Sequence, residues 1–196
     1  MQDFGFNFKF GITHIADWAG YDHILFVMAL CLRYLLKDWK RVLILVTAFT
    51  IGHSATLALS ALGYINISRD WIEFLIPVTI IVTALSNVLQ PEIKPNTRFP
   101  FVYFLALFVG LIHGLGFSNA FRSLLGKDTD VVGPLLAFNL GLEVGQLMIV
   151  IAVLLLTWIC VRVFKAPRRE YTIFMSGAIF GIAFLMAIER FINAIS

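Results

Sequence analysis

The chain has 196 residues, of which 60% are hydrophobic, 14% aromatic and only 14% charged, and its mean hydropathy is +0.89. Soluble domains carry about 45–50% apolar and about 25% charged residues, so this composition argues against a disordered chain and against a soluble globular domain. The net charge of +3 is typical of loop Lys and Arg residues in a membrane protein, and we expect no binding to nucleic acid. Cys31 and Cys160 lie in apolar runs, so we interpret them as buried thiols and not as a disulfide.

Six apolar runs predict six membrane-spanning helices in a single transmembrane domain over residues 1–196. In a bilayer every backbone polar group has to be satisfied within its segment, which makes runs of this length helices. The fold class we expect is therefore an all-α polytopic membrane bundle, without a cleavable signal peptide before the first span. The predicted spans are residues 22–36, 41–62, 71–89, 99–121, 132–161 and 172–192.

The distribution of Lys and Arg predicts the orientation of the spans. The side that holds the loops after the first, third and fifth spans carries ten: Arg33, Lys37, Lys40, Arg41, Lys94, Arg98, Arg162, Lys165, Arg168 and Arg169. The opposite side carries five: Lys9, Arg69, Arg122, Lys127 and Arg190. Loops rich in Lys and Arg stay in the cytoplasm. We therefore expect a protein of the bacterial cytoplasmic (inner) membrane with both termini in the periplasm.

Two pairs of short segments resemble each other and suggest an internal repeat. Residues 48–52 (AFTIG) in the second span match residues 137–141 (AFNLG) in the fifth, and residues 11–14 (GITH) match residues 110–113 (GLIH). The second and fifth spans run in opposite directions in the predicted topology, so the repeat would be an inverted repeat of three helices plus three. Such repeats are common in transporters, whose binding site lies near the middle of the membrane.

Ionisable side chains within the apolar runs are the candidate site residues. An ionisable group inside the membrane costs a few kcal/mol, so it usually faces a cavity or a partner. Imidazole binds nickel, cobalt, zinc and copper, and carboxylates compensate the charge of the ion. The candidates are all four histidines, His14, His23, His53 and His113, together with Asp22, Glu73 and Glu143.

Helix geometry places these candidates at a similar depth. At about 1.5 Å per residue, His53 lies about 18 Å and His113 about 21 Å from the inner face, and Glu143 lies about 16 Å from the outer face. In a hydrocarbon core about 30 Å thick, all three lie at the midplane or in the outer half. His14 and His23 can share an ion with them only if the segment between these two residues bends. The spacing therefore predicts one site that is reached from the outside.

We expect one divalent ion at this site, coordinated by His23, His53 and His113. Asp22 and Glu143 are expected to be ligands or partners of the ligands. Because imidazole must be neutral to bind a metal, the affinity should fall below about pH 6.

Further polar side chains extend the candidate site. Asn139, Glu143 and Gln146 stand at i, i+4 and i+7 and so share one face of a helix. An unpaired carboxylate at this depth is costly, so we expect Glu143 to be neutral until a cation binds and to exchange its proton for the metal. Ser54 and Glu73 are candidates for supporting the ligands or lining the pathway.

Thr83 and Asn87 in the third span are candidates for the inward route below the site. Structural interpretations are also compatible with the pattern. The histidines of the first span can be interfacial groups that touch water, His53 can form a hydrogen bond between helices, and the glycines beside His113 can serve packing alone.

Four motifs follow one another along the chain. They are His14 with residues 20–26 (GYDHILF), residues 47–57 (TAFTIGHSATL), residues 110–117 (GLIHGLGF) and residues 138–146 (FNLGLEVGQ). In this order they resemble the HupE/UreJ family of hydrogenase and urease accessory membrane proteins, in its second branch. The resemblance covers nearly the whole chain. It implies secondary transport of nickel or cobalt across the cytoplasmic membrane, with metalloenzyme maturation proteins as candidate partners.

Two departures from the family pattern accompany this resemblance. The seven residues between His14 and Asp22 form a longer spacer than the family has there. Because this spacer departs from the family's nickel motif, zinc, copper or iron are also candidates for the metal. Many members also carry a cleavable signal peptide, which we do not expect here.

Two other functions use the same residues. In an intramembrane metal-dependent hydrolase, a histidine-bound metal would activate water with Glu143 as the base and Ser54 nearby. In a haem protein, two facing histidines would be axial ligands. The chain has no P-loop motif, so we do not expect ATP to drive it. We prefer a permease to an enzyme, and the sequence leaves a homo-oligomer open.

Overall fold

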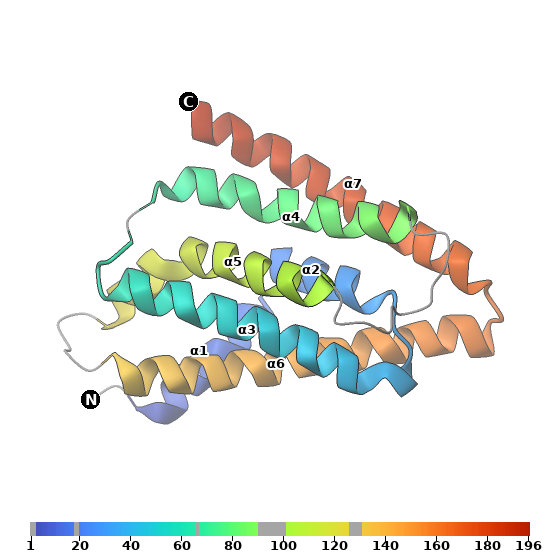
Figure 1. The fold of residues 1–196 in the computed structure, drawn as a ribbon, viewed down its shortest axis with the longest axis horizontal. Helices are drawn as coiled ribbons and strands as arrows, with labels where there is room; N and C mark the ends of the chain where they lie inside the picture. Colours follow the sequence, from blue (N-terminus) through green and yellow to red (C-terminus); the bar gives the residue numbers. More distant parts are fainter. Residues whose placement is uncertain (1–2, 18–19, 66, 90–100, 126–130) are drawn as a thin grey trace.

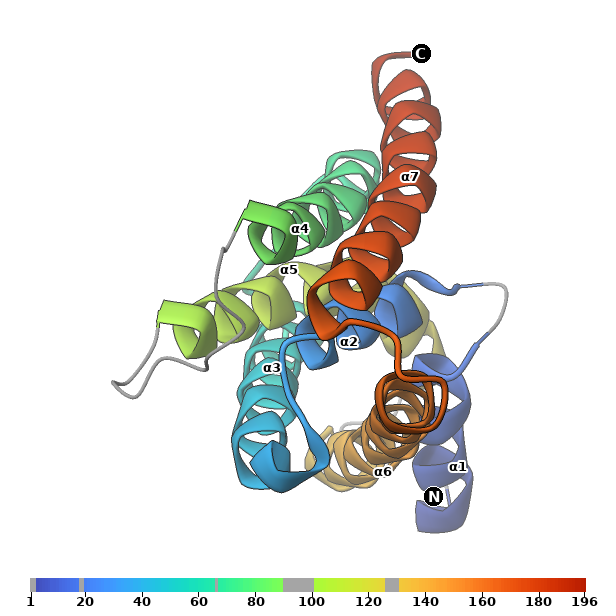
Figure 2. The ribbon, with the colours of Figure 1, turned by 90° about the vertical axis from the view of Figure 1, so that its right-hand side faces the viewer.

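The computed structural model describes residues 3–17, 20–65, 67–89, 101–125 and 131–196, and within them every element is a helix, as the all-α class predicts. The helices α3, α4, α5 and α6 run roughly along one common direction, α1 and α7 are inclined to them, and both termini lie at the same end of the bundle (Figures 1 and 2). The elements are α1 (Phe4–Ile15), α2 (Asp22–Cys31), the 3₁₀ helix η1 (Leu36–Asp38), α3 (Trp39–Ala61), α4 (Arg69–Leu89), α5 (Phe101–Leu125), α6 (Val132–Trp158), the π-helix η2 (Ile159–Val163) and α7 (Arg168–Ile195).

Five of these helices are long and apolar enough to cross a membrane, which makes the chain a multi-pass membrane protein. They cover residues 36–61, 69–89, 102–123, 132–163 and 168–195. The predicted second to sixth spans coincide with them, although residues 99 and 100 of the predicted fourth span lie outside the described residues. Lys94, Arg98 and Lys127, which contributed to the predicted orientation, also lie outside them.

The predicted first span, residues 22–36, is wrong as a single crossing. The helix there, α2, has only 10 residues, which is about 15 Å, or half of a hydrocarbon core. A separate helix, α1, precedes it and begins at the side chain of Asp3, which accepts a hydrogen bond from the backbone of Gly5. Gly20 and Tyr21 lie in a turn before the second of these helices.

The two short helices lie in opposite halves of the bundle (Figure 1). We call the end that carries both chain termini the termini end, and α1 lies in that half. We call the other end, which carries the loops of residues 32–35 and 164–167, the basic end, and α2 lies toward it. Seen from the basic end, α2 occupies the centre of the bundle (Figure 2), and eight of its ten residues are buried.

Two pairs of helices cross with their backbones in direct contact at glycines. In the α1–α6 pair, a Cβ on Gly11 would overlap the carbonyl oxygen of Phe138, and one on Gly141 would overlap the carbonyl oxygen of Phe8. In the α3–α5 pair, a Cβ on Gly110 would overlap the carbonyl oxygen of Phe49, and one on Gly52 would overlap the carbonyl oxygen of Leu107. These glycines are the ones that the two pairs of similar segments contain. The close crossings fix the positions of the histidines that follow the glycines.

Candidate metal centre

The structure brings all four histidines together from four different helices. His14 lies in the last turn of α1, His23 is the second residue of α2, His53 lies in the middle of α3, and His113 lies in the middle of α5. The break between α1 and α2 makes this possible, because it turns His23 back toward His14. Their ring centroids lie 4.8 Å apart.

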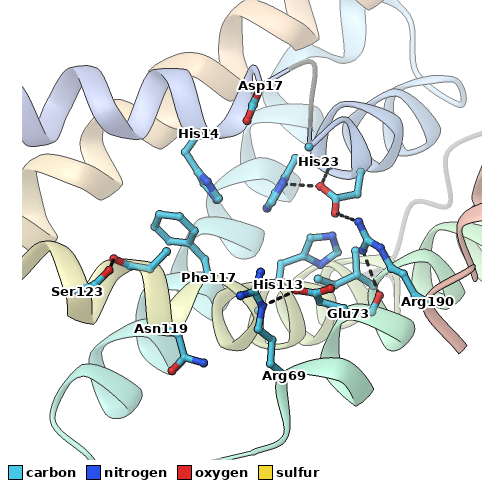
Figure 3. Close-up of a pocket in the computed structure, with 15 residues that line it drawn as sticks. His14, Asp17, His23, Arg69, Glu73, His113, Phe117, Asn119, Ser123 and Arg190 are labelled. Atoms are coloured by element: carbon cyan, nitrogen blue, oxygen red, sulfur yellow. Dashed lines mark hydrogen bonds and ion pairs between the residues drawn. The ribbon is translucent and has the colours of Figure 1, made fainter. Parts of the chain in front are cut away.

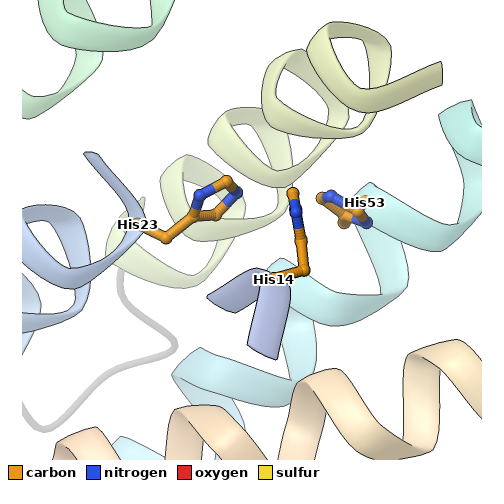
Figure 4. A group of neighbouring side chains, drawn as sticks. All are labelled: His14, His23 and His53. Atoms are coloured by element: carbon orange, nitrogen blue, oxygen red, sulfur yellow. The ribbon is translucent and has the colours of Figure 1, made fainter. Parts of the chain in front are cut away.

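Three of these histidines form a group that can hold a metal ion. His14, His23 and His53 each offer one ring nitrogen, and these nitrogens all lie within 4.8 Å of one another. The three rings point toward a common centre (Figure 4). The Nε2 atoms of His14 and His23 and both ring nitrogens of His53 are buried and have no hydrogen-bond partner among the described residues. We call His14, His23 and His53 the three-histidine group.

Asp22 fixes the orientation of the His23 ring. Its Oδ1 accepts a hydrogen bond from the backbone N–H of His23 at 2.8 Å and lies 2.9 Å from Nδ1 of the same residue. A proton held at Nδ1 in this way leaves the lone pair of Nε2 free for a metal. The other carboxylate oxygen, Oδ2, accepts a hydrogen bond from Arg190 at 3.1 Å. Asp22 is thus placed to orient a ligand and to balance the charge of the site.

Arg190 is held in place by a gap in the hydrogen bonding of α4. Pro77 lies inside this helix and has no N–H, so the carbonyl oxygen of Glu73, four residues earlier, lacks its helical partner. Arg190 Nη1 donates to that oxygen at 3.1 Å. One guanidinium therefore joins α7 to the backbone of α4 and to Asp22 of α2.

His113 lies beside the three-histidine group without belonging to it. Its Nδ1 lies 2.9 Å from the carbonyl oxygen of Val109, its Nε2 has no partner among the described residues, and its ring lies 4.9 Å from that of His23. All four histidines are candidates from the sequence, with His23, His53 and His113 expected to coordinate the ion, whereas the geometry groups His14 with His23 and His53.

A cavity of about 650 Å³ leads to the histidines. Among its lining residues are three histidines, His14, His23 and His113, and the ion-paired side chains Arg69, Glu73 and Arg190 (Figure 3). These ion pairs and Ser123 lie on the parts of α4, α5 and α7 nearest the termini end. The cavity therefore leads toward the termini end, and His53 lies deeper than the other three histidines because it does not line the cavity.

Aromatic rings surround the histidines on their other sides. The ring of Phe117 lies 3.8 Å from that of His14, and the ring of Phe138 lies 5.6 Å from His14 and 6.2 Å from His53. Phe49 lies 5.3 Å from His113. Such an apolar wall excludes water, so the attraction between a ligand nitrogen and a cation is stronger there than in bulk water.

The polar residues of α6 make contact with α3. Glu143 Oε1 accepts a hydrogen bond from Thr47 and Gln146 Oε1 accepts one from Thr50, both at 2.8 Å. Asn139 donates to its own helix, at the carbonyl oxygen of Leu135. The expected common face of α6 thus lies against α3 in part, and Glu143 belongs neither to the three-histidine group nor to the lining of the cavity.

The remaining predicted residues take supporting positions. Ser54 donates its hydroxyl proton to the carbonyl oxygen of Thr50 at 2.6 Å. Glu73 lines the cavity and pairs with Arg69. Thr83 and Asn87 of α4 are both buried. Thr83 donates its hydroxyl proton to the carbonyl oxygen of Thr79, and Asn87 donates to the carbonyl oxygen of Ala29 in α2, both at 2.8 Å.

Arg190 and Phe117 belong to the site but are not among the residues predicted from the sequence. Arg190 was counted among the charges outside the membrane, although a charged residue inside an apolar run is itself a sign of a functional position. Pro77 was the second sign, because a proline in a span frees a carbonyl oxygen that needs a donor. Phe117 carries no such sign, since the chain has 19 phenylalanines.

Substitution of Asp22 by Asn tests the orienting role. The amide has the same shape but loses the charge that Arg190 and the His23 Nδ1 proton both contact, so we expect nickel affinity to fall by about 10- to 100-fold. Glu189→Gln, an exposed carboxylate next to Arg190, is the matched control and should leave the affinity unchanged. Equilibrium dialysis of the purified variants measures both. Equal affinities for D22N and the wild type would show that Asp22 does not act on the ligands.

Comparison with known proteins identifies the family of the chain. The family model described as HupE / UreJ protein matches residues 1–190. The comparison with curated proteins and the comparison with solved structures gave no match. The match covers nearly the whole chain, including α1, the histidines and Arg190. The chain therefore belongs to the HupE/UreJ family of membrane proteins.

Proposed function

We propose that this protein is a secondary transporter that carries a divalent transition-metal ion, nickel or cobalt, across the bacterial cytoplasmic membrane. The observation that carries the proposal is the three-histidine group, whose unpartnered ring nitrogens lie at the inner end of a cavity that leads to one side. Neutral imidazoles suit nickel, cobalt, zinc and copper. Membership of the HupE/UreJ family, which is linked to nickel and cobalt handling, favours the first two.

The contacts of two residues favour transport over hydrolysis. A hydrolase would need Glu143 as a base and Ser54 as a neighbour at the metal. Glu143 instead accepts a hydrogen bond from Thr47, and the Ser54 hydroxyl donates to its own helix. The haem alternative is disfavoured by the rings of Phe117 and Phe138, which occupy the space beside His14 and His53 that a porphyrin would need.

We also propose that α1 and α2 together form a sixth, discontinuous crossing and that the chain is a 3+3 inverted repeat. In this arrangement α1–α2, α3 and α4 correspond to α5, α6 and α7. The equivalent glycine contacts of the α1–α6 and α3–α5 pairs support this correspondence. Discontinuous helices at the midplane are a common way of building ion sites in transporters.

The proposed orientation places both termini and the mouth of the cavity in the periplasm. The excess of Lys and Arg at the basic end supports this orientation, because such loops remain in the cytoplasm. The ion would then enter from the periplasm and leave at the basic end. This orientation is compatible with partners in metalloenzyme maturation on the cytoplasmic side and with a homo-oligomer.

Nickel uptake into proteoliposomes tests the transport and its coupling to protons. Wild-type protein should load nickel, and uptake should decrease as the solution is made acidic, because protons compete with the metal for the imidazole nitrogens. If Glu143 exchanges a proton for the metal, Glu143→Gln should keep the fold and lower pH-dependent uptake by about tenfold, the usual size of a coupling between two ligands. The amide can still accept the hydrogen bond from Thr47.

The outcomes separate the two parts of this proposal. Absence of nickel and cobalt uptake by wild-type protein would contradict the transport function. Wild-type uptake with the same pH dependence in Glu143→Gln would contradict only the proton coupling, and Glu143 would then be a packing residue. Glu170→Gln, an exposed carboxylate in the first turn of α7, serves as the control for loss of one negative charge.

A further inference from the structure

The half of the bundle at the basic end contains a second set of buried polar side chains. Asn87 near the end of α4, and Thr172 and Ser176 in the first turns of α7, are at most 5% exposed. Asn87 Oδ1 and the two hydroxyl oxygens have no hydrogen-bond partner in the part of the chain that the structure describes. We call these three residues the inner polar cluster.

Two hydrogen bonds place the inner polar cluster beside α2. Asn87 Nδ2 donates to the carbonyl oxygen of Ala29 in α2 at 2.8 Å. Arg168, the first residue of α7, donates to the carbonyl oxygen of Arg33, one helical turn after Ala29, at 2.8 Å. The two hydroxyl residues of the cluster follow Arg168 in α7 at intervals of one turn. The cluster is therefore bounded by α2, α4 and α7.

The register between α4 and α7 brings Asn87 opposite the hydroxyl of Ser176, and Thr172 lies one turn nearer the basic end. These antiparallel helices pack along each other, and at the termini end Arg190 bonds to the Glu73 carbonyl while the ring of Phe74 lies 5.3 Å from that of Phe191. Counting from these contacts toward the basic end places Asn87 at the level of Ser176.

A mostly apolar layer separates the inner polar cluster from the cavity of the histidines. The buried faces of α4 and α7 are polar toward both ends, with Glu73 and Arg190 at one and the cluster at the other. Between them lie the buried apolar side chains of Ile80, Ala84, Ile179 and Ala183. The buried hydroxyl of Thr83 also lies in this layer, and it donates to the carbonyl oxygen of Thr79 in its own helix at 2.8 Å.

We propose that the inner polar cluster is the exit position for the metal ion, a second site that a partly hydrated divalent cation contacts after it leaves the three-histidine group. This inference rests on the proposed transport function and adds to it the route on the cytoplasmic side. Amide and hydroxyl oxygens are weak ligands for a borderline metal, so the ion would not be retained there. An unpartnered buried polar group is costly, and a passing hydrated ion gives these three a partner.

The double substitution Thr172→Val and Ser176→Ala tests the exit position. It removes two hydroxyls with little change in volume, and nickel uptake into proteoliposomes should fall by about fivefold, the effect expected for losing one net hydrogen bond or more to the ion. Nickel affinity of the detergent-purified protein should stay unchanged, since the three-histidine group is intact. The unfolding temperature should stay the same or rise, because two unpartnered polar groups are lost.

The matched control makes the same chemical changes on α4. Thr79→Val with Ser86→Ala removes two hydroxyls that bond to carbonyl oxygens of their own helix, and it should leave uptake unchanged. If Thr172→Val with Ser176→Ala takes up nickel as fast as the wild type does, the exit position is wrong, and the proposed transport function is not affected. Loss of nickel affinity, or a lower unfolding temperature with slow uptake, would also overturn it, because the cluster would then hold a structural water. Absence of wild-type uptake would overturn both proposals.

Discussion

Replacing His53 by Ala is expected to abolish tight metal binding. Outer partners of a ligand alone contribute about 10- to 100-fold to affinity, so loss of one of three ligands should exceed about 100-fold. The protein should remain folded, because both ring nitrogens of His53 lack partners among the described residues and no hydrogen bond is lost with the ring. Equilibrium dialysis with nickel, together with size-exclusion chromatography of the same sample, measures the two effects.

His113→Ala distinguishes the three-histidine group from the ligand set predicted from the sequence. If the ion is held by the three-histidine group, this variant should bind nickel with an affinity much nearer to the wild type than His53→Ala. If His113→Ala loses binding as severely and His14→Ala does not, the ligand set is His23, His53 and His113, as predicted from the sequence. Retention of full metal stoichiometry in both His23→Ala and His53→Ala would rule out a site at these histidines.

Adding a methyl group at the glycine crossings is expected to destabilise the fold strongly. Gly52→Ala would push a Cβ into the carbonyl oxygen of Leu107, and Gly110→Ala into that of Phe49. Backbone atoms cannot yield as a flexible side chain can, so each change should cost about 1–3 kcal/mol or more. The unfolding temperature in detergent and the yield of folded protein measure this loss.

Gly177→Ala and Gly181→Ala are the matched controls for the crossings. Both positions lie in α7 with no atom within 4 Å of an added Cβ. Alanine there should be neutral or stabilise the helix by about 0.5–1 kcal/mol, because glycine loses more conformational freedom on folding. Equal tolerance of alanine at Gly52, Gly110 and Gly177 would contradict the close contact of α3 with α5.

Hydropathy and the position of single residues predicted much of this fold. The long helices follow from composition because lipid allows only satisfied backbones, and five predicted spans coincide with five observed helices. The histidines were found because imidazole is costly inside an apolar run. The sequence similarity around Gly11, Gly52, Gly110 and Gly141 pointed to positions that prove to be backbone contacts.

The rest depended on three-dimensional contacts that single spans do not reveal. A break between α1 and α2 is hard to predict, because each half is too short for a span signal and Gly20 permits a bend without requiring it. The choice of His14 over His113 depends on that break. The role of Arg190 depends on Pro77, which lies 113 residues earlier in the chain and acts through the carbonyl oxygen that it leaves free.

The interruption between α1 and α2 also brings two helix ends of opposite polarity to the candidate metal centre. The last turn of an α-helix carries a partial charge of about −0.5 from its aligned peptide dipoles, and the first turn carries about +0.5. α1 ends one residue after His14, and α2 begins one residue before His23. The two partial charges offset each other, and the carboxylate of Asp22 is already engaged by His23 and Arg190. An ion bound by the three imidazoles would therefore meet little unbalanced negative charge and could be released without breaking a carboxylate–metal bond.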